Sequence, residues 1–108
     1  MLYELRIYHS SPHKLPLLHK RFETITLKFW EQYGIRQSGF WTQLIGDNNT
    51  DLYYLLVWED LAERERKWNA FMADPGWIKA KADTEVDGPL YSSLTNMILT
   101  PTAYSLLK

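Results

Sequence analysis

Two apolar stretches separated by a polar one dominate the pattern of hydrophobic and polar positions along the chain. Residues 39–46 and 52–58 are rich in aromatic and aliphatic side chains, and the polar residues 47–51 between them predict the turn of a β-hairpin. Both alternating faces of the second stretch are apolar or aromatic. A strand without a polar face must be covered on both sides. We therefore expect helices of the same chain on one face and a second copy of the chain on the other.

The first third of the chain predicts a strand followed by a long helix. Residues 2–9 alternate with a period of two, which indicates a strand. From about residue 14 to residue 33 the apolar positions recur with the helical period, and Gly34 can end this helix in a left-handed conformation. The apolar stripe predicted for this helix consists of Leu15, Leu18, Phe22, Ile25, Phe29 and Tyr33.

A second helical region begins after the hairpin. Asp60 followed three residues later by Glu63 is typical of a helix N-terminus, because the two carboxylates can accept hydrogen bonds from free backbone N–H groups. We interpret the charged residues 63–67 as a solvated helix face. Asp74 and Pro75 predict the start of another, short helix over residues 77–82.

The end of the chain predicts a fourth strand over residues 91–99, which Pro101 stops. We expect the tail, residues 102–108, to lie across a neighbouring surface. The resulting order of elements predicts a ferredoxin-like βαββαβ fold of the α+β class, with a four-stranded antiparallel sheet and helices on one face. The other face would carry more aromatic side chains than a soluble monomer exposes, so we expect two sheets to pair in a homodimer, as a dimeric α+β barrel.

Composition narrows the classes of function. Residues 1–108 are long enough for one domain, and an aromatic content of 15% indicates an interface or a pocket. The absence of cysteine excludes disulfides and thiolate metal sites, and a net charge of -1 without a basic stripe argues against nucleic acid. No glycine-rich phosphate loop is present, and we expect no cofactor. No apolar stretch approaches the roughly 20 residues of a membrane span, and we expect a cytoplasmic protein.

Five short segments resemble the NIPSNAP family. They lie in order along nearly the whole chain, at residues 3–8 (YELRIY), 39–42 (GFWT), 58–65 (WEDLAERE), 73–77 (ADPGW) and 98–102 (ILTPT). The resemblance implies a dimeric α+β barrel, a superfamily that also contains cofactor-independent oxygenases, haem-degrading enzymes and chlorite dismutase-like proteins. It implies no known reaction. The chain departs from the family pattern at Gly76, where an acidic residue is more common.

Glu4, Arg6 and Tyr8 share one face of the first strand and are the first candidates for a ligand site. If this face lines the interior of the barrel, the three side chains could orient an anionic or aromatic ligand, and the guanidinium of Arg6 would project into the barrel. The alternative, which we favour, is a structural ion pair. Further candidates for the pocket wall are Trp41, Gln43, Tyr54 and Trp58, for which packing is the simpler interpretation.

Two other polar residues are candidates for chemistry. His9, at the end of the first strand, could act as a general base or could be a half-exposed loop residue. The spacing of His9, His13 and His19 does not suit a metal site, and we expect none. Asn96 stands in an apolar strand and needs a partner, which could be a ligand, by analogy with related oxygenases, or a neighbouring backbone group.

Three hypotheses for function remain open at this point. The first is a homodimeric protein of the NIPSNAP type that binds a small organic or anionic ligand in the barrel cavity. The second is a cofactor-independent monooxygenase or a related enzyme of the same fold. The third is a protein–protein interaction module. An enclosed cavity lined by Arg6 and aromatic residues would favour the first two, and a filled barrel with an apolar outer patch would favour the third.

Overall fold

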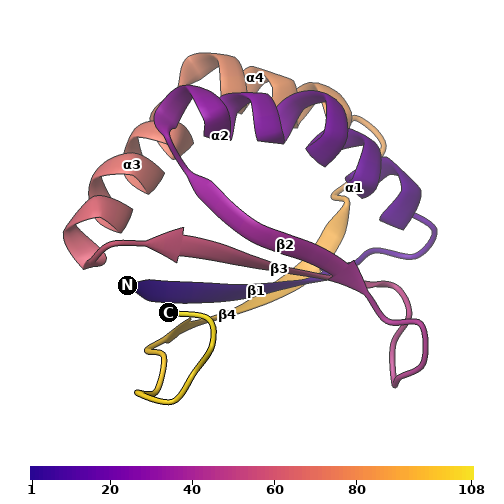
Figure 1. Cartoon of the computed structure of the whole chain (residues 1–108). Coiled ribbons are helices and arrows are strands. Elements are labelled where there is room, and N and C mark those ends of the chain that lie inside the picture. The colour runs from indigo at the N-terminus through magenta and orange to yellow at the C-terminus, as the bar shows by residue number, and fades with distance from the viewer.

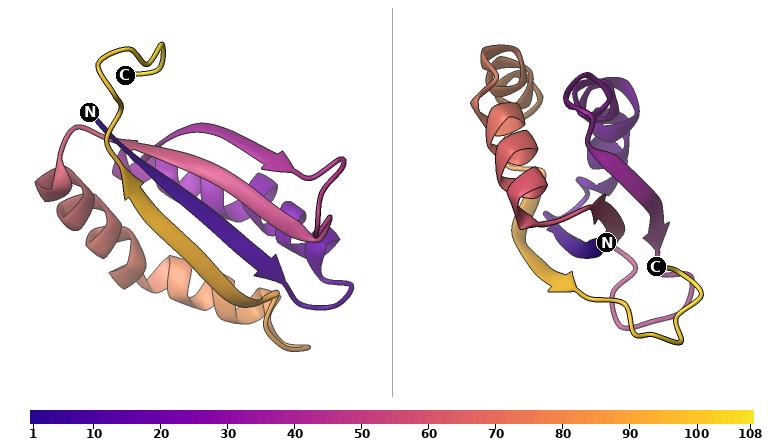
Figure 2. Two further views of the ribbon diagram at one scale, coloured as in Figure 1. Left: turned by 90° about the horizontal axis from the view of Figure 1, so that it is seen from below. Right: turned by 60° about the vertical axis from the view of Figure 1, so that its left-hand side comes forward.

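The computed structural model describes all residues from Met1 to Lys108 and has the predicted order of elements. Both helical regions lie on one face of a single curved antiparallel sheet, and the other face of the sheet is open (Figures 1 and 2). The ferredoxin-like α+β fold is therefore confirmed. The elements are β1 (Leu2–Ser10), α1 (Leu15–Arg21), the π-helical segment η1 (Phe22–Thr26), α2 (Leu27–Tyr33), β2 (Arg36–Thr42), β3 (Asp51–Trp58), α3 (Leu61–Ala73), α4 (Pro75–Thr84) and β4 (Tyr91–Leu99).

The strands are arranged in the order β2-β3-β1-β4, so that β1 and β3 are central and β4 is an edge strand that pairs with β1 alone. In the register of the two central strands, Glu4 is opposite Leu56, and Arg6 is opposite Tyr54. All four of these residues are buried under the helices. The odd-numbered residues of β1 and β3 point to the open face of the sheet.

This register corrects the expected position of Glu4, Arg6 and Tyr8. Their side chains lie between the sheet and the helices of their own chain, and not on the open face where a second sheet would form a barrel. Contacts to the helices show this directly, because Arg64 of α3 bonds to Glu4 and the ring of Phe22 in η1 packs on Tyr8. The charged and phenolic side chains of β1 are on this side because both helical regions supply partners for them.

The first helical region contains a turn that the sequence pattern does not predict. In η1 the backbone N–H of Leu27 bonds to the carbonyl of Phe22, five residues earlier, which is the hydrogen bond of a π-helix. The wider turn shifts the buried face by one residue, so that Thr26 and Trp30 are buried. Of the predicted stripe, Leu18 and Phe22 are buried, whereas the other members are partly buried and pack against the core, namely Leu15, Ile25, Phe29 and Tyr33.

The second helical region starts as predicted. Asp60 precedes α3 and accepts a hydrogen bond from the backbone N–H of Glu63 at 2.8 Å, and the Glu63 side chain accepts one from the backbone N–H of Glu59. Asp74 in turn accepts hydrogen bonds from the backbone N–H groups of Gly76 and Trp77 at the start of α4. These side chains satisfy N–H groups that have no partner inside the helix.

The first strand of the hairpin is displaced from its predicted position. It spans Arg36–Thr42 and not residues 39–46, and Leu44 and Ile45 are about 95% exposed in the connecting loop. The reason lies in Gln43, which donates hydrogen bonds to Asp47 and Tyr53 and accepts one from the backbone of Asn48. These bonds fold the chain into a loop directly after Thr42, so Leu44 and Ile45 do not pair with β3.

No helix in the structure is long and apolar enough to cross a membrane. The chain after β4 runs below the open face of the sheet, close to the N-terminus (Figure 1). Tyr104 and Leu106 in this tail are almost fully exposed, and the proposal that it lies across a neighbouring surface stays a prediction.

Candidate functional site

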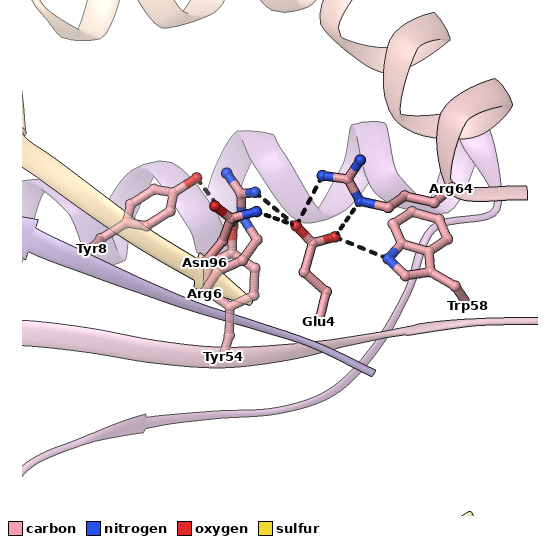
Figure 3. Close-up of polar contacts among 7 residues, drawn as sticks. All are labelled: Glu4, Arg6, Tyr8, Tyr54, Trp58, Arg64 and Asn96. Atoms are coloured by element: carbon pink, nitrogen blue, oxygen red, sulfur yellow. Dashed lines mark hydrogen bonds and ion pairs between the residues drawn. The ribbon is translucent and has the colours of Figure 1, made fainter. Parts of the chain in front are cut away.

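A fully buried carboxylate connects the central strand to the second helical region. Oε1 of Glu4 accepts hydrogen bonds from Nε1 of Trp58 at 3.0 Å and from Nε of Arg64 at 2.8 Å. Oε2 accepts three more, from Nη1 of Arg6 at 3.1 Å, Nη2 of Arg64 at 3.0 Å and Nδ2 of Asn96 at 2.9 Å (Figure 3). Residues that are far apart in the sequence therefore meet at one side chain.

The environment of Glu4 fixes its charge. Burial by itself would raise the pKa of this carboxyl group, but the hydrogen bonds from Arg64, Asn96 and Trp58 and the charge of Arg6 outweigh burial and lower the pKa to about 2. Glu4 is therefore ionised, and five donors occupy its two oxygens. A carboxylate in this state is a structural anchor and a poor general base.

Arg6 is the buried cation of the site, with a side chain only 8% exposed. Its Nε donates to the hydroxyl of Tyr54 at 2.7 Å, and its guanidinium carbon lies 4.6 Å from the centre of the Trp68 ring. Burial opposes the charge, but the neighbouring Tyr54, Tyr8 and Glu4 outweigh it and raise the pKa of Arg6 above its ordinary value. Its hydrogen bonds to Tyr54 and Glu4 use Nε and one N–H of Nη1, so the guanidinium, including Nη2, has further N–H groups for an acceptor.

Two tyrosines extend this network along the sheet. The hydroxyl of Tyr54 donates to the hydroxyl of Tyr8 at 3.0 Å, and the two rings meet edge to face. Burial, and next the charge that Tyr8 would carry, raise the pKa of Tyr54 well above its ordinary value. Tyr54 is therefore a neutral phenol that both donates and accepts a hydrogen bond.

A cavity of about 100 Å³ lies between the sheet and both helical regions, next to Arg6. Nine of its thirteen lining residues are hydrophobic, and none is acidic. Met72 of α3 and Leu94 of β4 in its wall are partly exposed to solvent. The lining residues are Arg6, Tyr8, Arg21, Phe22, Thr26, Trp30, Trp68, Phe71, Met72, Trp77, Lys81, Tyr91 and Leu94.

Six of the nine residues that the sequence suggested as ligand candidates come together in this region, and two of them, Arg6 and Tyr8, line the cavity. Tyr54 contacts Arg6, while Trp58 and Asn96 donate to Glu4. The partner that Asn96 requires is thus a carboxylate and not a backbone group. The six residues are Glu4, Arg6, Tyr8, Tyr54, Trp58 and Asn96.

The other three candidates lie elsewhere. Trp41 lines a separate, more open hollow of about 330 Å³ between β2 and the first helical region, and Gln43 organises the hairpin loop. His9 lies at the end of β1, where Nδ1 is 3.1 Å from Oδ1 of Asp51 and Nε2 is 3.0 Å from Oγ1 of Thr95. These contacts connect three neighbouring strands on the face of the sheet that is turned away from the cavity.

Sequence reasoning missed three residues of the site. Arg64 was assigned to a solvated face, but it shares the spacing i, i+4, i+7 with Trp68 and Phe71, and this spacing would have placed it toward the sheet. Trp30 follows Phe22 by eight residues, which is also a helical spacing, whereas the polar Thr26 carried no such signal.

The structure contains no group of three His, Asp or Glu side chains that could hold a metal ion. The donors of the site consist instead of guanidinium, phenol, indole and amide groups. Such groups suit the recognition of an organic molecule, and they do not suit metal coordination.

Comparison with known proteins identifies the family. The model of the NIPSNAP family matches residues 3–106. The chain belongs to the NIPSNAP family. A search of curated proteins gave no significant match to this NIPSNAP chain.

Solved structures place this NIPSNAP protein among bacterial relatives of the same fold. An uncharacterized NIPSNAP domain protein from Burkholderia xenovorans is 26% identical, with 97% of this chain and 98% of that chain covered and a TM-score of 0.83. A NIPSNAP family protein from Agrobacterium tumefaciens is 21% identical over 99% of this chain and 98% of that chain, with a TM-score of 0.87. A Deinococcus radiodurans protein named as a candidate antibiotic biosynthesis monooxygenase shares the fold at 14% identity, with 94% and 93% covered and a TM-score of 0.61.

Proposed function

We propose that this NIPSNAP protein is a homodimer that binds a small organic molecule in each subunit, in the cavity between the sheet and the helices. The observation that carries the proposal is the cavity itself, whose walls are mainly aromatic and whose floor holds the buried guanidinium of Arg6. A concave apolar site with a few polar groups is the usual form of a small-molecule site. The proposed site differs from the barrel cavity that the sequence suggested, because it lies within one chain.

The open face of the sheet supports the homodimer. The centre of this face is apolar, with Ile7 of β1 and Leu55 of β3, and Met97 and Leu99 of β4 are about 40% exposed in the single chain. A second sheet packed on this face would cover them, together with the odd-numbered residues of β1 and β3. The exposed tail, residues 102–108, lies on the same side and could contact the second subunit (Figure 1).

Native mass spectrometry of the freshly purified protein tests both parts of the proposal. We expect the mass of a dimer, and an additional small mass that denaturation releases. A monomer at micromolar concentration would contradict the homodimer. A dimer without a retained molecule, and without binding of any compound from a library of small organic molecules, would contradict the ligand site. A monomer with an empty cavity would favour the third hypothesis, an interaction module.

A cofactor-independent monooxygenase is the second candidate function. The likeness to the Deinococcus radiodurans protein shows a common fold, and the phenols of Tyr8 and Tyr54 beside the cavity could hold a small dicarbonyl substrate, whereas a volume of about 100 Å³ is too small for an aromatic one. Oxygen consumption in the presence of such substrates, measured with an electrode, tests this function. Loss of the consumption in a Tyr8→Phe variant would link it to the cavity.

A further inference from the structure

We propose that the cavity binds a short-chain carboxylate, whose oxygens accept hydrogen bonds from the Thr26 hydroxyl, the Trp30 indole N–H and Nη2 of Arg6. This inference rests on the proposed ligand site and names the chemical class of its ligand. Three properties of the cavity support it: its donors without acceptors, its charge and its size.

The first property is a pair of buried donors without a partner. Only three buried side-chain polar atoms in the chain form no hydrogen bond, namely Ser10 Oγ, Thr26 Oγ1 and Trp30 Nε1. Two of the three belong to the wall of this cavity, although Thr26 and Trp30 are only 3% and 2% exposed. Buried polar groups nearly always have partners, so two donors in one cavity wall indicate an acceptor that the protein itself does not provide.

The π-helical segment is the reason why Thr26 and Trp30 line the cavity. Thr26 is the last residue of η1, and Trp30 follows it by one helical turn in α2. A regular α-helix would have buried the apolar residues Ile25 and Phe29 at this level, as the sequence pattern predicts. Single π-helical turns are frequent at functional sites. Here the turn brings Thr26 and Trp30, each with a hydrogen-bond donor, into the wall of the cavity.

The second property is an excess of positive charge. The charged residues in the wall are Arg6, Arg21 and Lys81, and no acidic residue lines the cavity. Arg21 is paired with Glu85 at 3.2 Å, whereas Lys81 forms no ion pair and lies over the ring of Tyr91.

The pairing beneath the cavity adds to this excess. Two guanidinium groups, of Arg6 and Arg64, share the single carboxylate of Glu4. Glu4 neutralises only one of the two guanidinium charges, so the three side chains together have a net charge of +1. An anionic ligand would balance it, and its oxygens would suit Nη2 of Arg6.

The third property is size. A volume of about 100 Å³ corresponds to roughly three waters at liquid density, and it is smaller than the cavity of about 150 Å³ that accommodates benzene in another protein. A carboxylate with about two to four carbon atoms fits this volume. Its alkyl part would contact the aromatic walls, and its carboxylate would lie toward the donors.

Propionate and its neutral analogue propionamide form a matched pair of probes, because they have the same number of non-hydrogen atoms. Trp30, Trp68 and Trp77 line the cavity, so their fluorescence reports binding in a titration at constant ionic strength. We expect propionate to bind at least tenfold more tightly than propionamide. Equal binding of the two probes would contradict the proposal that the ligand is an anion, but not the proposal that the cavity is a ligand site. Binding of neither probe would overturn this inference, while the library search described above decides separately on the ligand site.

Substitution of Thr26 locates the contact. Thr26→Val keeps the shape of the side chain and removes the hydroxyl, and we expect it to weaken propionate about tenfold and propionamide much less. The melting temperature of the free protein should stay unchanged or rise, because the hydroxyl has no partner to lose. Thr24→Val, at an exposed position two residues earlier in η1, is the matched control and should bind like the original protein. Unchanged propionate binding in both variants would overturn the assigned contact.

Trp30→Phe provides the second test, since it removes the indole N–H and keeps an aromatic ring. We expect a further loss of propionate affinity in the double variant Thr26→Val, Trp30→Phe, read from the remaining tryptophans. If nuclear magnetic resonance shows only exchanging water in the cavity at high propionate concentration, the unpaired donors serve hydration and the inference is wrong.

Discussion

Arg64 and Glu4 are joined by two parallel hydrogen bonds, of 2.8 Å from Nε to Oε1 and of 3.0 Å from Nη2 to Oε2. The side chain of Arg64 is 28% exposed, whereas Glu4 is fully buried. The pair is therefore asymmetric. Glu4 has no access to water as an alternative partner, whereas Arg64 could turn its guanidinium toward solvent.

This asymmetry predicts unequal effects of substitution. Glu4→Gln leaves Arg6 buried without its carboxylate, and we expect it to lower the free energy of unfolding by about 3–5 kcal/mol. Arg6→Met should cost less, because Glu4 keeps its bonds to Arg64, Asn96 and Trp58. Urea denaturation measures both changes. Glu65→Gln, on the exposed side of α3, is the control and should change the value by less than about 0.5 kcal/mol.

The double variant Glu4→Gln, Arg6→Met separates a structural role of Arg6 from a role in binding. If the pair is only structural, the double variant should recover part of the stability that Glu4→Gln loses, because the unpaired guanidinium is gone. If Arg6 also holds a ligand, propionate binding should be lost in Arg6→Met and in the double variant. Full binding in both variants would remove Arg6 from the proposed ligand site.

The lowered pKa of Glu4 predicts how stability depends on pH. The pKa is about 2 in the folded protein against an ordinary value of 4.5, so the folded state holds the proton less tightly than the unfolded state. The stabilisation is present above about pH 4.5 and is lost as the pH falls toward 2, by about 3 kcal/mol in total. The difference in unfolding free energy between the original protein and Glu4→Gln should shrink over this range. Parallel pH curves for the two proteins would contradict the prediction.

Leu55 and Leu56 are neighbours on opposite faces of β3 and form a matched test of the homodimer. Leu56 is fully buried under the helices, so Leu56→Lys should unfold the chain. Leu55 points to the open face, so Leu55→Lys should produce a folded monomer with the original circular dichroism spectrum. Light scattering after size-exclusion chromatography gives the mass. A dimer of Leu55→Lys with the original affinity would show that the open face is not the contact between subunits.

The N-terminus of α3 offers a prediction about local structure. Asp60→Ala removes the acceptor for the backbone N–H of Glu63, and we expect a loss of about 1 kcal/mol in the free energy of unfolding. Asp60→Ser retains an acceptor and should lose much less. Thermal unfolding followed by circular dichroism compares the two. Equal losses would mean that the charge of Asp60, and not its hydrogen bond, stabilises the helix.

The sequence was sufficient for the fold because the pattern that determines it is local and repeated. Alternation in β1 and the caps Asp60 and Asp74 each act within a few residues, and the structure has all of them. The boundary of β2 was wrong because hydrogen bonds from Gln43 across the loop outweighed the strand preference of Leu44 and Ile45.

The site was only partly predictable. Glu4, Arg6 and Tyr8 were recognised because they share one face of a strand, but which layer covers that face depends on contacts between distant segments. The π-helical turn that positions Thr26 leaves no mark in the 3.6-residue period. The spacing of Arg64 to Trp68 places it toward the sheet, but the interpretation of residues 63–67 as one solvated face concealed this signal.

The position of β1 in the centre of the sheet has a consequence for the order of events in folding. The neighbours of β1 are β3 and β4, which begin at Asp51 and Tyr91. The first strand of the chain therefore cannot pair until these later segments are present. The donors that surround Glu4 are just as distant, the last being Asn96. Contacts between such remote residues slow folding, because a long loop must close before they form. A nascent chain therefore remains incomplete, with an ionised Glu4 still in water, until the ribosome has synthesised β4.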